Sequence, residues 1–238
     1  MAAKTTTNPQ ESWKLSKVYL VGYNGTQIVG WTYMLLHTLC YFLNRGTLDN
    51  LWKEISWNLV IFQNAAALEV LHAILGIVPT GVFLTLTQVT SRVFLVCGVL
   101  LVSDAARISP GIVLCVLAWS ITEIIRYSYY VANTIGQPPP LLMLLRYSTF
   151  FLLYPLGVTG ELLCIYDSLE DIAARQFWTV PVLSYYITIP SQYHIIFSML
   201  YHYFLICWML LYIPMFPMLF GHMMQQRKKV LSKFMNSY

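Results

Sequence analysis

The chain has 238 residues, of which 58% are hydrophobic and only 10% are charged, and its mean hydropathy is +0.61. Soluble domains carry about 25% charged residues, so the composition excludes an ordinary soluble protein and indicates an integral membrane protein. The net charge of +4 is small and its cations are dispersed, which gives no support for nucleic acid as a partner.

Six apolar stretches approach the roughly 20 residues that a helix needs to cross a bilayer. They lie near residues 18–43, 57–78, 82–102, 111–131, 141–166 and 195–220. Glycine- and proline-containing turns separate the first five, at residues 44–46, 79–81, 109–111 and 136–140. Residues 1–17 are polar and show no cleavable signal peptide. The predicted fold is therefore all-α, a polytopic membrane protein with six transmembrane helices around a polar interior.

The charges outside these spans predict the topology. Segment 1–17 has three lysines against one glutamate, and segment 221–238 has four cations and no acid. Loop 167–194 instead has three acids against one arginine. Its aromatic patch, which lies between Pro181 and Pro190, is too short to cross, so we expect the loop to rest at the interface. An excess of Lys and Arg marks the cytoplasmic side. We therefore expect a cytoplasmic N-terminal segment (1–17), a six-span membrane domain (18–220) and a basic cytoplasmic tail (221–238).

No metal or cofactor site is expected. Glu69-x-x-His72 in the second span resembles half of a di-iron carboxylate site, but such a site needs a second pair and further glutamates. We expect these two side chains to form hydrogen bonds within the bundle. The five cysteines lie in or beside apolar runs without CxxC spacing, which is typical of small core residues rather than of disulfides or metal ligands.

The third and fourth spans also carry charge. Gln88 and Arg92 lie one turn apart, and Arg92 needs a buried anionic partner, for which Glu69 and Glu161 are the candidates. Glu123 and Arg126 have the i, i+3 spacing of a local ion pair, for which we favour a structural role. The three arginines and three glutamates of the predicted spans are expected to converge on one polar interior, as in an intramembrane enzyme or a transporter.

The fifth span contains the sequence RYSTFFLLYPLGVTGELLCIY, residues 146–166. A carboxylate in hydrocarbon costs a few kcal/mol or more, so Glu161 marks a candidate functional site. Tyr154 lies two helical turns before it, on the same face and about 10 Å away along the axis. Pro155, Gly157 and Gly160 predict an open, kinked face. The residues alone support two readings equally: a catalytic pair, or an interfacial tyrosine with a glutamate that pairs with an arginine elsewhere.

The segments ITEIIRYSYY, LRYSTFFLLYPLGVTGELLCIY, LEVLHAILGIVP, TQVTSRVF and QQRKKVLSK resemble the 3-hydroxyacyl-CoA dehydratase family, also known as protein-tyrosine-phosphatase-like A. The likeness covers residues 18–233 in the same order, and plant members look most similar. The resemblance implies a six-span endoplasmic reticulum lyase of very-long-chain fatty acid elongation. It would convert (3R)-3-hydroxyacyl-CoA to trans-2-enoyl-CoA, the third of four steps, without a cofactor, and would feed sphingolipid synthesis.

The resemblance also assigns site residues. The catalytic tyrosine and glutamate of the family fall on Tyr154 and Glu161. Further family positions, with supporting or substrate-binding roles, match Glu69, Gln88, Arg92, Arg146 and Gly157. Dehydration needs a base for the C2 proton and an acid for the departing C3 hydroxyl. Which member of the pair takes the proton stays open. The implied partners are the condensing enzyme, the ketoacyl reductase and the enoyl reductase of elongation.

With cytoplasmic termini, the fifth span enters the bilayer near Leu141. At 1.5 Å per residue Tyr154 lies roughly 20 Å deep and Glu161 roughly 30 Å deep. We therefore expect a deep tunnel, with Arg146 near its mouth as a candidate for binding the CoA phosphates.

One alternative function is a non-catalytic scaffold of the elongase complex or a phosphoprotein-binding protein. Another is a transporter, against which the absence of an inverted repeat counts. A phosphatase is disfavoured because CGVLLVSDAAR lies in and beside an apolar span.

Overall fold

The computed structural model describes residues 9–78, 81–174, 179–182, 185–188 and 193–235. The helices are α1 (Pro9–Leu43), α2 (Leu48–Ala65), α3 (Ala67–Ile74), α4 (Val82–Phe94), α5 (Asp104–Arg107), α6 (Pro110–Ile135), α7 (Pro140–Ser148), α8 (Phe150–Ala174) and α9 (His194–Met235). A π-helical segment, η1 (Leu95–Leu100), continues α4, and two short strands, β1 (Thr179–Val182) and β2 (Tyr185–Thr188), precede α9.

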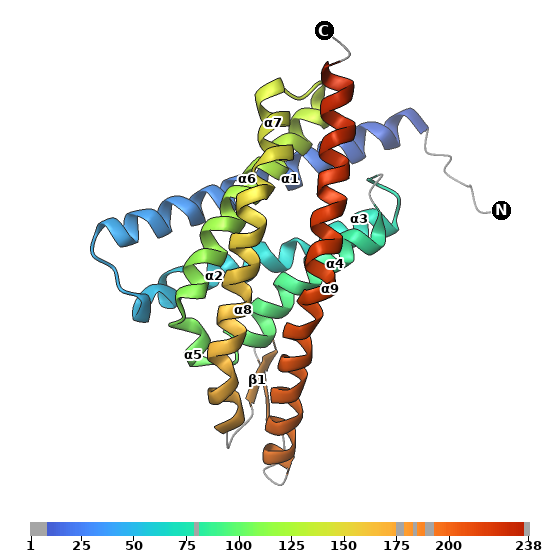
Figure 1. Cartoon of the computed structure of the whole chain (residues 1–238). Coiled ribbons are helices and arrows are strands. Elements are labelled where there is room, and N and C mark those ends of the chain that lie inside the picture. Colours follow the sequence, from blue (N-terminus) through green and yellow to red (C-terminus); the bar gives the residue numbers. More distant parts are fainter. Residues whose placement is uncertain (1–8, 79–80, 175–178, 183–184, 189–192, 236–238) are drawn as a thin grey trace, which may run out of the picture.

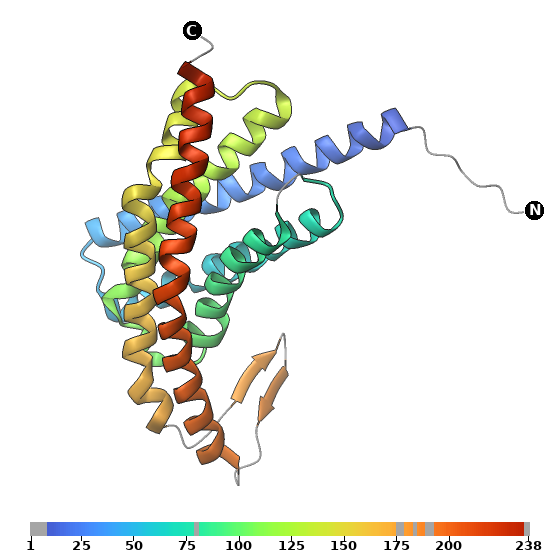
Figure 2. The same ribbon diagram turned by 45° about the vertical axis from the view of Figure 1, so that its right-hand side comes forward.

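Three long helices, α6, α8 and α9, run side by side along the length of the molecule (Figure 1). Helix α1 crosses them obliquely and packs mainly against α6, while α2, α3 and α4 lie to one side of the long helices (Figure 2). Helix α7 and the C-terminal end of α9 meet at one end of the molecule, and α5 and the strands lie at the other (Figure 1). This arrangement gives the molecule two distinct ends along the axis of α9.

The backbones of α6 and α8 approach each other closely at Gly111 and Gly160. A Cβ atom on Gly160 would lie 2.7 Å from the carbonyl oxygen of Gly111, and one on Gly111 would lie 2.5 Å from the carbonyl oxygen of Gly160. Small residues allow such contacts between membrane helices, where van der Waals packing drives association. The pair fixes the register of α8 against α6 one residue before Glu161.

Helices occupy all six predicted spans, and α6, α8 and α9 are each long and apolar enough to cross a membrane on their own. The other stretches are interrupted. The second span divides at Ala66 into α2 and α3, and the third changes from α4 into the π-helical η1. Near the first break, the side-chain amide of Asn64 donates to the carbonyl of Val60 at 2.8 Å, a local bond that competes with helix geometry. The predominantly helical class is thus confirmed for the described residues, with three helices that are long and apolar enough to span a membrane.

The fifth span differs from its predicted form. Helix α8 is continuous through Pro155 and both glycines, and the interruption lies upstream at Thr149, between α7 and α8. Pro155 is the sixth residue of α8, so it removes an intrahelical bond to the carbonyl of Phe151 without ending the helix. Helices are interrupted near each of the predicted turns at 44–46, 109–111 and 136–140, although Pro110 and Gly111 already belong to α6 and Pro140 to α7. Residues 79–80 lie outside the described residues.

The described parts of segment 167–194 form helix and strand rather than a plain loop. Helix α8 continues to Ala174, and β1 and β2 pair antiparallel, with Thr179 opposite Thr188. The all-α prediction therefore omits this hairpin, whose threonine, valine, tyrosine and isoleucine residues favour a strand. Asp171 of α8 accepts hydrogen bonds from the hydroxyl of Ser103 at 2.6 Å and the backbone N–H of Asp104 at 3.1 Å, so it joins α8 to α5.

Candidate active site

A cavity of about 1040 Å³ lies among α1, α3, α4, α6, α7, α8 and α9. Along α9 its lining extends from Gln226, near the end that holds α7, to Trp208, which is about 27 Å at 1.5 Å per residue. Every residue that the family resemblance singles out lines this one cavity: Glu69, Gln88, Arg92, Arg146, Tyr154, Gly157 and Glu161. The predicted polar interior, lined by several helices, is confirmed.

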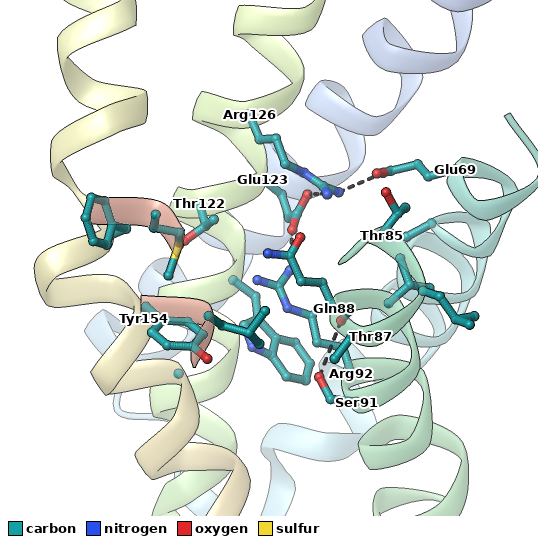
Figure 3. A pocket seen from close by; sticks show the side chains of 18 of the residues that line it. Glu69, Thr85, Thr87, Gln88, Ser91, Arg92, Thr122, Glu123, Arg126 and Tyr154 are labelled. Carbon is teal, nitrogen blue, oxygen red and sulfur yellow. Dashed lines mark hydrogen bonds and ion pairs between the residues drawn. The ribbon is translucent and has the colours of Figure 1, made fainter. Parts of the chain in front are cut away.

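Tyr154 projects from α8 toward the polar side chains of α4 across the cavity (Figure 3). Its ring stacks on Phe216 of α9, with the centroids 5.1 Å apart and the planes 10° apart, and a second ring, Phe220, lies 6.4 Å away. Within the described part of the chain the Tyr154 hydroxyl has no hydrogen-bond partner. The ring is therefore held by packing while its hydroxyl is available to a ligand.

Glu161 lies in α8 and is only 5% exposed. Its Oε2 accepts a hydrogen bond of 2.6 Å from the hydroxyl of Tyr212 in α9, and the indole of Trp119 also faces it. Among the described residues no lysine or arginine lies within ion-pair distance of this carboxyl group. The structural alternative, a glutamate that pairs with an arginine, is therefore wrong for Glu161. A buried acid without a cation is a strong candidate for function.

The other buried charges form one network across three helices. Glu123 of α6 pairs with Arg92 of α4, and its second oxygen lies 2.6 Å from Arg126. Arg126 also contacts Glu69 of α3 at 2.7 Å, and the Tyr127 hydroxyl donates to the same glutamate (Figure 3 shows the ion pairs). The predicted Glu123–Arg126 pair is confirmed. The predicted partners of Arg92, Glu69 or Glu161, were wrong. Glu69 pairs with Arg126, and Arg92 pairs with Oε1 of Glu123.

Arg146, in the last turn of α7, has a different environment from these paired arginines. Its guanidinium lies 5.0 Å from the ring centroid of Tyr129 and 4.7 Å from that of Tyr130, and it donates to the Tyr130 hydroxyl at 3.1 Å. No carboxylate pairs with it among the described residues, and its buried Nε has no partner there. A cation held by aromatic faces at one end of the cavity can bind an anionic group such as a phosphate.

Several further features refine the site. A Cβ atom on Gly157 would make ordinary contacts, 3.6 Å to the nearest atom of Trp119, so Gly160 rather than Gly157 is the residue at which helices touch. A hydrogen bond of 2.9 Å joins Nε2 of His72 to the hydroxyl of Tyr19, as expected for His72 within the bundle. All five cysteines are free, and no group of three metal-ligating side chains occurs among the described residues.

Sequence reasoning did not identify the residues of α9 that contact the pair. Tyr212, Phe216 and Phe220 stand four residues apart in the sixth span, and an aromatic row of this kind is also typical of lipid-facing or interfacial positions. The one signal in the sequence is this spacing, which places the three rings on one helix face. Their partners on α8 are visible only once the two helices are placed together.

Comparison with known proteins gives a consistent result. The family model described as "Protein tyrosine phosphatase-like protein, PTPLA" matches residues 63–233. The chain is similar to a protein from Caenorhabditis elegans named very-long-chain (3R)-3-hydroxyacyl-CoA dehydratase, which is 42% identical over 90% of this chain and 95% of the relative. It is also similar to very-long-chain (3R)-3-hydroxyacyl-CoA dehydratase 2 from Mus musculus, which is 41% identical over 92% of this chain and 82% of the relative.

A relative of the same name from Oryza sativa subsp. japonica, PASTICCINO 2B, is 35% identical over 91% of this chain and 94% of its own length. These three identities do not favour the plant members over the animal ones, contrary to the expectation from the motifs. No solved structure matches the chain.

Proposed function

The chain belongs to the protein tyrosine phosphatase-like (PTPLA) family, and from this premise we propose that it is a very-long-chain (3R)-3-hydroxyacyl-CoA dehydratase. It is a lyase that removes water from (3R)-3-hydroxyacyl-CoA and forms trans-2-enoyl-CoA in fatty acid elongation. The relatives that carry this activity in their names match about nine-tenths of the chain, and the family model covers residues 63–233. The likeness is therefore not confined to one motif.

The observation that carries the proposal is the placement of Tyr154 and Glu161 on one wall of the same cavity. Both project from α8, and both line the space that also reaches Arg146. Neither is engaged in an ion pair within the described residues, whereas the glutamates and arginines around Glu123 neutralise one another. A carboxyl group and a phenol hydroxyl without ion-pair partners are thus present together, and a dehydration can use them as its acid and base.

In the proposed reaction one group of the pair removes a proton from C2, and the electrons of that C–H bond form the C2–C3 double bond. The C3–O bond breaks, and the departing hydroxyl takes a proton from the other group and leaves as water. A carboxyl group and a phenol hydroxyl can each donate or accept a proton. The group that acted as base is then protonated and the other is deprotonated, so a proton must pass from the first to the second before the next turnover. The net reaction consumes no external acid or base and changes no oxidation state that would need a cofactor.

The same cavity suggests how the substrate is held. We propose that the polar CoA group lies at the end marked by α7, where Arg146 binds a phosphate, and that the pantetheine arm extends inward to the pair. Figure 1 places the basic C-terminal part of α9 at that end, which agrees with a cytoplasmic opening. The polar wall opposite α8 is formed by Gln88, Arg92 and Glu69. Because Gly157 has no side chain, it leaves room beside the indole of Trp119.

The topology remains part of the proposal. We propose six spans within residues 18–220, with segments 1–17 and 221–238 in the cytoplasm, in the endoplasmic reticulum membrane. The condensing enzyme and the two reductases of elongation are the proposed partners, because they supply the substrate and consume the product. A cysteine introduced at position 146 should react with a membrane-impermeant reagent from the cytoplasmic side, and labelling only from the lumen would contradict this orientation.

The activity is tested with purified protein in detergent and a very-long-chain (3R)-3-hydroxyacyl-CoA, by following the trans-2-enoyl product. We expect the wild type to be active and both Tyr154→Phe and Glu161→Gln to lose turnover while they keep the wild-type circular dichroism. An inactive, well-folded wild type would refute the dehydratase. Activity that survives both substitutions would place the chemistry elsewhere in the cavity.

A further inference from the structure

Helix α9 presents one face to both proposed catalytic residues. It runs antiparallel to α8 (Figure 1), and its residues 212, 216 and 220 follow one another at four-residue spacing. Phe216 and Phe220 stack on Tyr154, and Tyr212 donates its hydroxyl to Glu161 at 2.6 Å. Antiparallel packing matches the order of these contacts, since the later residues of α9 meet the earlier residue of α8. One helix face therefore holds the whole pair.

The contact at Glu161 differs from those of the other buried glutamates because no arginine takes part in it. Glu123 pairs with arginines, and Glu69 pairs with Arg126 while also accepting from the Tyr127 hydroxyl. Among the described residues Glu161 forms no ion pair and accepts from the neutral hydroxyl of Tyr212. A cation would stabilise only the ionised carboxylate. A tyrosine hydroxyl donates to a carboxylate and can accept from a carboxylic acid, so it can hold the group in both protonation states. This property suits a residue that must gain and lose a proton in every turnover.

We propose that Tyr212 is a positioning residue for the dehydration, whose hydroxyl holds the Glu161 carboxyl in the orientation that faces the reacting carbons. The terminal torsion of a glutamate is broad and nearly two-fold, so packing of the stem alone does not fix the plane of the carboxyl group. The short hydrogen bond from Tyr212 to Oε2 restricts that plane from the α9 side, while the indole of Trp119 faces the carboxyl from α6. The inference rests on the proposed function of Glu161.

The kinetic test is Tyr212→Phe, which removes the hydroxyl and keeps the ring. Misplacement of a catalytic group by about 1 Å can cost on the order of 100-fold in rate, so we expect kcat to fall about 10- to 100-fold while KM changes less than about two-fold. Tyr201→Phe is the matched control. Tyr201 also lies in α9 and donates to the carbonyl of Gly98 at 2.7 Å, but it does not line the cavity. Its loss should lower the unfolding temperature and leave kcat within about two-fold.

An infrared readout tests the contact without any turnover. The carboxyl bands of Glu161 are identified by their loss in Glu161→Gln, and we expect them to shift in Tyr212→Phe and not in Tyr201→Phe. If the wild type is inactive but the bands shift, the dehydratase fails while the contact stands. Unshifted bands with wild-type kcat would overturn the inference, as would a KM increase that accounts for the entire loss of kcat/KM.

A variant that preserves packing covers the case in which Tyr212→Phe does not fold. Fluorotyrosine incorporated at position 212 keeps the ring and the hydroxyl but makes the hydroxyl a stronger donor. We then expect the Glu161 bands to move and kcat to change at unaltered KM. Bands that are identical to those of the wild type would show that this hydroxyl does not act on Glu161.

Discussion

Substitution of Gly160 by alanine tests the packing that places α8. The added Cβ atom would lie 2.7 Å from the Gly111 carbonyl oxygen, and 2.8 Å and 2.9 Å from the Sγ and backbone nitrogen of Cys115. Two of these three atoms belong to the backbone of α6, so no side-chain rotation relieves the contact. Helices α6 and α8 must move apart for the variant to fold.

The magnitude follows from two opposing effects. Overpacking of a closely packed site costs about 1–3 kcal/mol, and a clash with backbone belongs at the upper end of that range. Alanine regains about 1 kcal/mol over glycine in a helix interior. The net loss is about 2 kcal/mol. For a chain of this length each kcal/mol lowers Tm by about 2–4 °C, so we expect a decrease of about 4–8 °C.

Gly157→Ala is the matched control, because it makes the same chemical change three residues earlier in the same helix. Its Cβ atom would be 3.6 Å from the nearest atom of Trp119, an ordinary contact, so only the helix preference of about 1 kcal/mol remains. Thermal unfolding in one detergent, followed by circular dichroism, compares the two variants with the wild type. Equal Tm values for the two variants would refute the close approach of Gly111 and Gly160.

Three further outcomes are expected. Arg146→Ala should raise KM for the acyl-CoA at least several-fold and leave KM unchanged for an acyl-pantetheine thioester without nucleotide phosphates; equal effects on both would refute phosphate binding. Glu123→Gln removes the charge that holds Arg92 and should lower stability by about 3–5 kcal/mol, the typical cost of breaking a buried ion pair, as measured by denaturant unfolding in detergent. A lipid-soluble maleimide should label the exposed Cys207 quickly and the fully buried Cys115 only on unfolding, and equal rates would contradict the packing of α6.

The sequence predicted the helices well because apolar length decides where a chain can cross a bilayer. It also indicated which polar residues meet, since buried charge at mid-span requires a shared interior, and all seven of the candidate site residues line one cavity. The partner of Arg92 was mispredicted because hydropathy and spacing do not give the rotation of one helix about another. Glu123 was predicted to pair with Arg126, and because a carboxylate has two oxygens it pairs with Arg92 as well.

The contribution of α9 could not be predicted for a related reason. A row of aromatic residues in an apolar helix is compatible with lipid, with an interface or with a site, and only the neighbouring helix distinguishes these. Tyr212 lies between leucine and isoleucine and carries no charge that would single it out. The hairpin was not predicted because its segment is too short for a transmembrane helix, although it is long enough for two short strands.

The charge network affects how the chain inserts into the membrane while it is being synthesised. Helix α6 carries Glu123 and Arg126 as its own neutral pair and is apolar enough to enter the bilayer unaided. Helices α3 and α4 emerge earlier, each with one unmatched charge that costs roughly 2.5–3.5 kcal/mol at mid-membrane, and neither is a long apolar span. We expect nascent chains that end before residue 110 to expose Glu69 and Arg92 to lipid or to the insertion machinery. Membrane integration of the first half would then be completed only when α6 arrives.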